Sequence, residues 1–172
     1  ALRKEAHDEW GLWLPHMPPE WGGMGLGPTA MAAVSAEAAK VSIGPFVLNA
    51  QAPDEGNQHT LLHWGTDEQK QKYLKPLCDG TARSCFAMTE PAVASSDATN
   101  IESSIVRDGD DYVINGHKWY TTGATDPRCK IAIFMGKTDP QNPNRHLQQS
   151  MILVPMDAPG VKVIRPLPVF GF

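Results

Sequence analysis

The chain has 172 residues, of which 41% are hydrophobic and 20% are charged, and its net charge is −4. This composition is ordinary for a globular protein, and a chain of this length can bury roughly 70% of its extended surface. No apolar run approaches the roughly 20 residues that span a bilayer, and the lack of a lysine- and arginine-rich run argues against a nucleic-acid binder.

The cysteines point to a reducing compartment. Cys78, Cys85 and Cys129 are an odd number without CxxC spacing, so neither a disulfide framework nor a zinc site is expected. His59 and His63 lie one helical turn apart, but no third ligand is evident.

The first residues lack a hydrophobic signal core, which leaves secretion unsupported. Bacterial cytoplasm, mitochondrial matrix and peroxisome all remain open.

The first half of the chain has the pattern of helices. Residues 29–40 are rich in alanine, the best helix former, and follow Pro28, which suits a first helical position. Residues 54–64 form a second candidate helix, with Gly65 as its C-terminal cap.

A third helix is predicted to follow directly. Thr66 and Gln69 have the spacing of a capping box, which opens a helix. This helix should run through about residue 78 and close at Gly80. Residues 1–80 are therefore predicted to be a helical portion that begins inside its first helix.

The second half changes to the alternating pattern of strands. Residues 103–107 and 112–115 flank Asp108-Gly109-Asp110, which is a strong hairpin signal. Three further aliphatic or β-branched runs lie at 131–135, 151–154 and 161–164. We predict an α+β fold in which residues 81–172 form a small antiparallel β-barrel or sandwich after the helical portion.

The segment FAMTEPAVASSD begins at Phe86. Its first residues have a strand pattern, Thr89 stands at the strand end, and the chain turns at the following Glu-Pro pair. A threonine there offers a hydroxyl and a backbone N–H to a bound ring, and Ser95 and Ser96 can reach phosphate oxygens. An ordinary strand-to-loop corner is the alternative from the residues alone.

The segment INGHKWYTTGA begins at Ile114 and has similar features. Trp119 and Tyr120 are aromatic residues near a strand end, and their faces can stack on a flat ring. Thr121 and Thr122 then supply adjacent hydroxyls. A hairpin whose aromatic residues fill the core is the alternative.

Together the two segments resemble the acyl-CoA dehydrogenase family. The shared pattern is TEP with Ala/Ser and Ser-Asp, followed by ING-x-K-aromatic-aromatic-x-T. Residues 52–80 are similar to the family's helical lead-in. FAMTEPAVASSDATN is closest to the subgroup fused to kinase-like and hydrolase-like domains in animals, whose members handle long or 4-hydroxylated acyl chains. The resemblance covers essentially the whole chain and implies FAD as cofactor and acyl-CoA as substrate.

The resemblance also implies roles for single residues. Thr89 would bond the pyrimidine side of the flavin through its hydroxyl and backbone. Tyr120 takes the position of the aromatic residue that flanks the ring, and Thr122 that of the threonine donating toward flavin N5. The predicted cofactor-binding residues are Phe86, Met88, Thr89, Ser95, Ser96, Tyr120, Thr121 and Thr122.

Three departures from the family pattern stand in the same segments. Ser95 matches the serine that contacts the bound thioester or its pantetheine arm, but one extra residue leaves Ser95 and Ser96 as alternatives. Ala92 and Ala94 stand where glycine is common. Tyr120 replaces a more usual tryptophan.

The family's catalytic base is a carboxylate in a later helical domain, which also completes the flavin and CoA sites and builds the oligomer. We expect this chain to be a fragment that stops within the β portion, at residues 170–172, and lacks that domain. No catalytic base is assigned here, and Glu90 is expected to have a structural or capping role.

The implied activity is dehydrogenation of an acyl-CoA to trans-2-enoyl-CoA, with hydride transfer to flavin N5, in fatty acid β-oxidation. The implied partners are an electron-transfer flavoprotein and further copies of the chain in a homodimer or homotetramer. Two alternatives stay open: an acyl-CoA oxidase that uses oxygen, and a flavin- or CoA-binding interaction module without turnover.

Overall fold

The computed structural model describes residues 1–169. The expected end of the chain within the β portion, at residues 170–172, lies outside them. The chain divides into two compact units, Ala1–Arg83 and Ser84–Phe172, close to the division predicted after residue 80. Along the described part of the chain, no helix is both long and apolar enough to cross a membrane.

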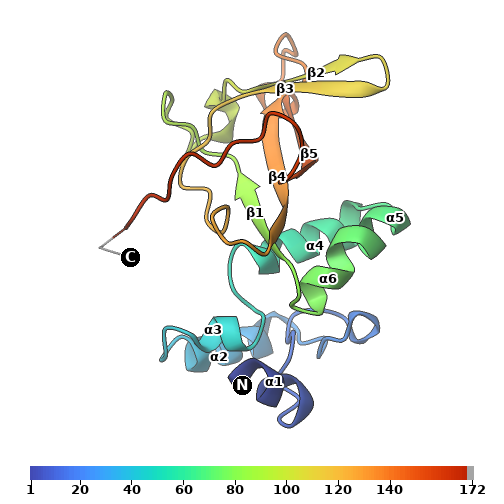
Figure 1. Ribbon diagram of the computed structural model, residues 1–172, viewed down its shortest axis with the longest axis vertical. Helices are drawn as coiled ribbons and strands as arrows, with labels where there is room; N and C mark the ends of the chain where they lie inside the picture. The colour runs from blue at the N-terminus through green and yellow to red at the C-terminus, as the bar shows by residue number, and fades with distance from the viewer. Residues whose placement is uncertain (170–172) are drawn as a thin grey trace. The chain divides into compact units, whose positions relative to one another are not determined.

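The first unit is helical, as predicted (Figure 1). The predicted helix at 29–40 is α2, and the one at 54–64 is α4. Its helices are α1 (Leu2–Asp8), α2 (Pro28–Ala38), α3 (Gly44–Val47), α4 (Asp54–Trp64), α5 (Asp67–Gln69) and α6 (Lys75–Cys78), with a 3-10 turn at Pro19–Trp21 and a π-helical turn at Lys70–Leu74.

The predicted third helix is therefore α5, the π-helical turn and α6 in direct succession. Its capping box is confirmed, because the Thr66 hydroxyl accepts from the Gln69 N–H and the Gln69 side chain accepts from the Thr66 N–H. Gly80 follows its end with a φ of +69°, a left-handed conformation that glycine adopts without strain. Gly65 caps α4, but in an extended conformation.

The core of the first unit lies between α4, α6 and the loop after α1. Leu14, Leu61 and Leu77 are almost completely buried there. An ion pair of 2.6 Å between Arg83 Nε and Asp54 Oδ2 is buried as well.

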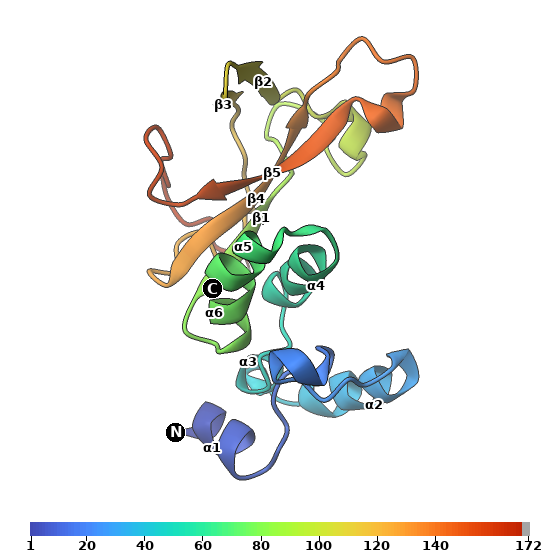
Figure 2. The ribbon, with the colours of Figure 1, turned by 90° about the vertical axis from the view of Figure 1, so that its right-hand side faces the viewer.

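The second unit is built on five strands. These are β1 (Arg83–Ala87), β2 (Ser104–Asp108), β3 (Asp111–Asn115), β4 (Cys129–Lys137) and β5 (Gln149–Pro155). They form one curled sheet, a half-barrel, in the order β1-β4-β2-β3, with β5 also paired to β4. Figure 2 shows β4 and β5 as long neighbouring strands. Ile105, Ile131 and Ile133 are buried in this sheet.

Two details of the predicted β portion are wrong. The sheet is not wholly antiparallel, because β2 and β4 pair in parallel through Ser104 and Lys137. The predicted strand at 161–164 does not form, and Ile164 there is 74% exposed. Its residues have the propensity of a strand, but a strand also needs a neighbour to pair with, and none of the strands in residues 1–169 pairs with it.

Candidate functional site

The two segments singled out in the sequence meet in the second unit. The Trp119 N–H donates to the Thr89 carbonyl over 3.1 Å, and the Thr89 hydroxyl donates to the Trp119 carbonyl over 2.8 Å. Thr89 lies just after β1, whereas Trp119 lies after β3. Two reciprocal hydrogen bonds therefore bring together residues that are far apart in the sequence.

The chain turns sharply at Tyr120, next to this contact. Tyr120 has a φ of +47°, which is uncommon for a residue with a side chain, and its carbonyl accepts from the Thr122 N–H over 3.0 Å. The Trp119 and Tyr120 rings lie 4.9 Å apart and are 39% and 54% exposed. The Thr122 side chain is exposed as well. Two aromatic rings and a threonine, all within residues 119–122, are therefore accessible to solvent.

A buried ion pair lies beneath this accessible group. Glu90 Oε1 accepts from the Lys118 ammonium over 2.7 Å, and both side chains are only about 5% exposed. The Glu90 carboxylate also accepts from the backbone N–H groups of Glu102, over 2.7 Å, and Ser103, over 3.0 Å. Lys118 donates in addition to the Met88 carbonyl over 2.8 Å.

These contacts set the protonation of the pair. Burial opposes ionisation of Glu90, but the hydrogen bonds from Lys118, Ser103 and Glu102 outweigh it and lower the pKa of the carboxyl to about 2. Burial lowers the pKa of Lys118, although the attraction of Glu90 opposes that change. A carboxylate with these partners holds structure together, as expected for Glu90, and is a poor base near neutral pH.

The two candidate serines have different surroundings. Ser95 is buried, and its hydroxyl accepts from the Glu90 N–H over 2.7 Å and donates to the Glu90 carbonyl over 3.3 Å. Ser95 therefore closes the turn that follows Thr89. Ser96 is exposed, so the structure favours Ser96 as the serine whose side chain is free to reach a ligand.

The remaining predicted residues border the same contact. Phe86 is half-buried in β1, and Met88 is half-buried between β1 and Thr89. Thr121 is half-buried between Tyr120 and Thr122, and its carbonyl accepts from the Ala124 N–H over 3.1 Å.

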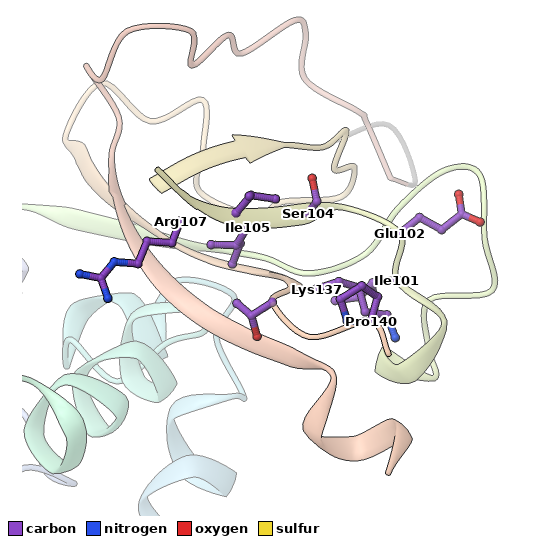
Figure 3. Close-up of a pocket in the computed structure, with 9 residues that line it drawn as sticks. Ile101, Glu102, Ser104, Ile105, Arg107, Lys137 and Pro140 are labelled. Carbon is purple, nitrogen blue, oxygen red and sulfur yellow. The ribbon is translucent and has the colours of Figure 1, made fainter. Parts of the chain in front are cut away.

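A hollow of about 420 Å³ lies elsewhere in the second unit, and none of its lining residues belongs to the predicted flavin set. Figure 3 shows Ile101, Lys137 and Pro140 grouped together, with the Arg107 and Glu102 side chains at opposite ends. The Lys137 ammonium already donates to the Thr99 carbonyl over 2.9 Å and to Gln148 Oε1 over 2.6 Å. The charge of Lys137 is thus committed to internal partners.

The histidine pair noted in the sequence is part of a row of rings in the first unit. His16 and His59 lie 5.2 Å apart between ring centroids, and His59 and His63 are stacked at 6.1 Å. Within residues 1–169, no three histidine, cysteine or acidic side chains are grouped so that they could hold a metal ion.

Comparison with known protein families shows which family the chain belongs to. Residues 85–172 match the sequence model of the acyl-CoA dehydrogenase middle domain, and residues 2–81 match that of the N-terminal domain. The chain belongs to the acyl-CoA dehydrogenase family. The resemblance found in the sequence and the predicted α+β fold are thereby confirmed.

Several relatives of this acyl-CoA dehydrogenase family chain are similar over almost its whole length. It is 53% identical to acyl-CoA dehydrogenase family member 10 of mouse over 99% of the chain, and 52% identical to the probable acyl-CoA dehydrogenase FadE2 of Mycobacterium tuberculosis, also over 99%. It spans 16% and 41% of their lengths. A solved structure of a candidate acyl-CoA dehydrogenase from Mycobacterium abscessus is 48% identical to this chain and has a TM-score of 0.94. The match covers 99% of this chain and 42% of that structure's chain.

Two other solved structures are similar to this chain at lower identity. A glutaryl-CoA dehydrogenase from Mycobacterium smegmatis, solved in complex with FADH2, is 26% identical with a TM-score of 0.68 over 92% of this chain and 38% of its own. A variant of a steroid ACAD is 32% identical with a TM-score of 0.69 over 92% of this chain and 39% of its own.

Lys118 is the functional candidate that the sequence reasoning missed. It was noted only as part of the family pattern, and no role was predicted for it. The available signal was a pair of oppositely charged residues, Glu90 and Lys118, one near the strand end of each segment. Charged side chains in such positions tend to pair with each other.

Proposed function

We propose that the full-length protein is an FAD-dependent acyl-CoA dehydrogenase that converts an acyl-CoA thioester to trans-2-enoyl-CoA. Family membership supports a dehydrogenase-type oxidoreductase and a flavoprotein. The proposal of this particular reaction with FAD rests on the two reciprocal hydrogen bonds between Thr89 and Trp119, which join the segments that begin at Phe86 and Ile114. FAD, when bound, supplies the hydride acceptor of the reaction.

The residues around this contact fit a flat ring with polar edges. The Thr89 hydroxyl donates its proton to Trp119, so its oxygen has lone pairs left to accept a hydrogen bond from a ring N–H. The Thr122 hydroxyl is exposed, and no residue from 1 to 169 forms a hydrogen bond with it. We assign to it a hydrogen bond to the ring nitrogen that accepts hydride, and to Tyr120 a contact with the ring face.

Substrate and partners follow from the same proposal. We propose a fatty acyl-CoA as substrate, with Ser96 or Ser95 at the thioester or pantetheine arm. We also propose an electron-transfer flavoprotein as electron acceptor and a homodimer or homotetramer as the assembly. We propose a carboxylate outside this chain for abstraction of the α-proton, because Glu90 is buried and held ionised by three hydrogen bonds.

The test uses the full-length protein. Its visible flavin absorbance should bleach anaerobically on addition of a fatty acyl-CoA. Thr122→Val removes the hydroxyl at nearly constant volume and should slow bleaching by about a hundredfold to a thousandfold, the usual cost of one such donor. Thr138→Val is the matched control, because within residues 1–169 the Thr138 hydroxyl bonds only Ser150, 2.8 Å away in the neighbouring β5.

Three results would contradict the proposal or part of it. No bleaching with fatty acyl-CoA of any chain length, nor with a steroid thioester, would exclude a dehydrogenase. Bleaching by a steroid thioester alone would correct the substrate class. Equal rates for Thr122→Val and the wild type would remove Thr122 from the site.

A further inference from the structure

The ion pair between Glu90 and Lys118 holds the same two segments that carry the proposed cofactor contacts. The Lys118 ammonium binds the Met88 carbonyl and the Glu90 carboxylate, which are on either side of Thr89 in the sequence. The next residue, Trp119, exchanges two hydrogen bonds with Thr89 itself. Three consecutive residues after β1 are therefore bound by two consecutive residues after β3.

We propose that Glu90 and Lys118 are positioning residues for the cofactor, fixing the corner at Thr89 against the turn that presents Tyr120 and Thr122. This inference rests on the proposed function. Neither side chain touches the cofactor, because both are almost completely buried. Their effect passes through Thr89 and Trp119, whose mutual hydrogen bonds they hold in place.

The chemistry of the pair suits this role. Charge-assisted hydrogen bonds are shorter and stronger than neutral ones, and one ammonium here binds two acceptors on different sides of Thr89. The Phe134 ring of β4 lies 4.8 Å from the ammonium and adds a third contact. The lysine head group is thereby fixed relative to the sheet as well as to both segments.

Glu90 extends the same network to another part of the chain. Its carboxylate accepts from the N–H groups of Glu102 and Ser103, just before β2, while Ser95 closes the turn on its backbone. Displacing Thr89 from Trp119 would therefore strain several charge-assisted bonds at once. A site held this way keeps its donors near the productive geometry, and a displacement of about 1 Å can slow the reaction at such a site by about a hundredfold.

A role in stability alone makes a different prediction. If the pair only stabilised the second unit, any variant of equal instability would affect cofactor binding to the same extent. If the pair positions the two segments, cofactor affinity should fall more than in a destabilised control that keeps Glu90 and Lys118 intact.

The experiment compares Lys118→Met with Ile131→Ala in the full-length protein. Methionine keeps most of the apolar stem of Lys118 and removes the ammonium. Ile131 is buried in β4, with 1% exposure, and its loss destabilises the sheet by leaving a cavity. The measurements are chemical unfolding without cofactor, the FAD dissociation constant by fluorescence quenching, and amide hydrogen exchange over residues 116–122.

The expected results separate the two roles. Lys118→Met should weaken FAD binding by about tenfold to a hundredfold, which is the loss expected when one or two hydrogen bonds to the ring are misplaced. It should also speed amide exchange at Trp119. Ile131→Ala should leave the FAD dissociation constant within about twofold at comparable stability. The double variant Glu90→Gln/Lys118→Met leaves no unpaired buried charge, so it should regain stability without regaining affinity. It also serves as the folded variant if Lys118→Met does not fold.

The positioning role is overturned if Lys118→Met or the double variant has the same FAD dissociation constant as the control. That result would leave the proposed function intact. Wild-type protein that binds no FAD would overturn both. Restored affinity in the double variant would also contradict positioning, because it would show that an unpaired charge caused the loss.

Discussion

At the scale of single residues, Glu90 shows how surroundings decide what a carboxylate can do. The residue lies in the turn after β1, beside the proposed cofactor residues, which is a position where a carboxylate could be taken for the catalytic base. Its oxygens instead accept from Lys118 and from two backbone N–H groups. These donors favour the ionised form and leave little capacity to take up a proton at neutral pH.

The pH dependence of stability should therefore report on Glu90. Its pKa falls from an ordinary value of 4.5 to about 2 in the folded state, so its contribution to stability is present above pH 4.5 and is lost as the pH falls toward 2. One pKa unit corresponds to about 1.4 kcal/mol, which makes this contribution about 3 kcal/mol. Urea unfolding of wild type and Glu90→Gln between pH 2 and 6 measures it.

The two proteins should differ most at pH 6 and converge near pH 2. Glu102→Gln is the matched control, because the Glu102 side chain is exposed and its link to Glu90 is through the backbone. A Glu90→Gln variant whose stability falls as steeply as that of wild type below pH 4.5 would show that Glu90 is not ionised by these contacts.

At the scale of elements, the sequence predicts a turn or a helix cap correctly where residues close together in the chain specify it. The capping box at Thr66 and Gln69 formed as predicted, and the Asp108-Gly109-Asp110 turn joins β2 and β3 in the register Asp108↔Asp111. Both depend on side chains and backbone within a few residues. The predicted strand at 161–164 failed because strand formation depends on a partner that its own residues do not specify.

The β2–β3 turn allows a paired test of glycine. Gly109 has a φ of +63° and Gly56 lies within α4; a Cβ would meet nothing within 4 Å at either position. Gly109→Ala should lower the unfolding free energy by about 1 kcal/mol because the left-handed conformation disfavours a side chain. Gly56→Ala should raise it by about 0.5–1 kcal/mol because alanine favours the helix.

Chemical unfolding of the two variants and of wild type measures both changes in unfolding free energy, which should have opposite signs. Since no side chain or backbone crowds either position, steric clash cannot account for a difference. Equal effects of the two substitutions would mean that the conformation of the β2–β3 turn is not the source of the requirement for glycine.

At the scale of the whole molecule, all the proposed cofactor residues lie in the second unit. The hydrogen bonds among Thr89, Glu90, Lys118 and Trp119 are all made inside that unit. Its sheet supplies the frame, with β1 leading into Thr89 and β3 leading toward Trp119. Binding of a cofactor at these residues should therefore stabilise this unit directly.

This linkage predicts the effect of removing the cofactor. Full-length protein stripped of flavin should melt at a lower temperature, and added FAD should restore the melting temperature in a concentration-dependent way. At a free FAD concentration of about 100 times the dissociation constant, the gain is about 2.7 kcal/mol. Differential scanning calorimetry with FAD and, as a control, with AMP measures it; an unchanged melting temperature with FAD would contradict binding to the folded state.

The sequence by itself determined the helices at 29–40, at 54–64 and after the capping box at Thr66, the hairpin, and the family to which the chain belongs. Each of these is encoded by residues close together or by the order of residues in a motif, such as TEP and ING-x-K. It also identified Thr89, Tyr120 and Thr122 as candidates, because their residue types and places after strands suit a polar ring.

Only the tertiary structure decided which of these residues touch one another. The pairing of Thr89 with Trp119, the burial of Lys118 against Glu90, and the enclosure of Ser95 all join residues through the sheet. Side-chain partners, burial and protonation depend on what the fold brings close in space, and no local pattern in the chain specifies that.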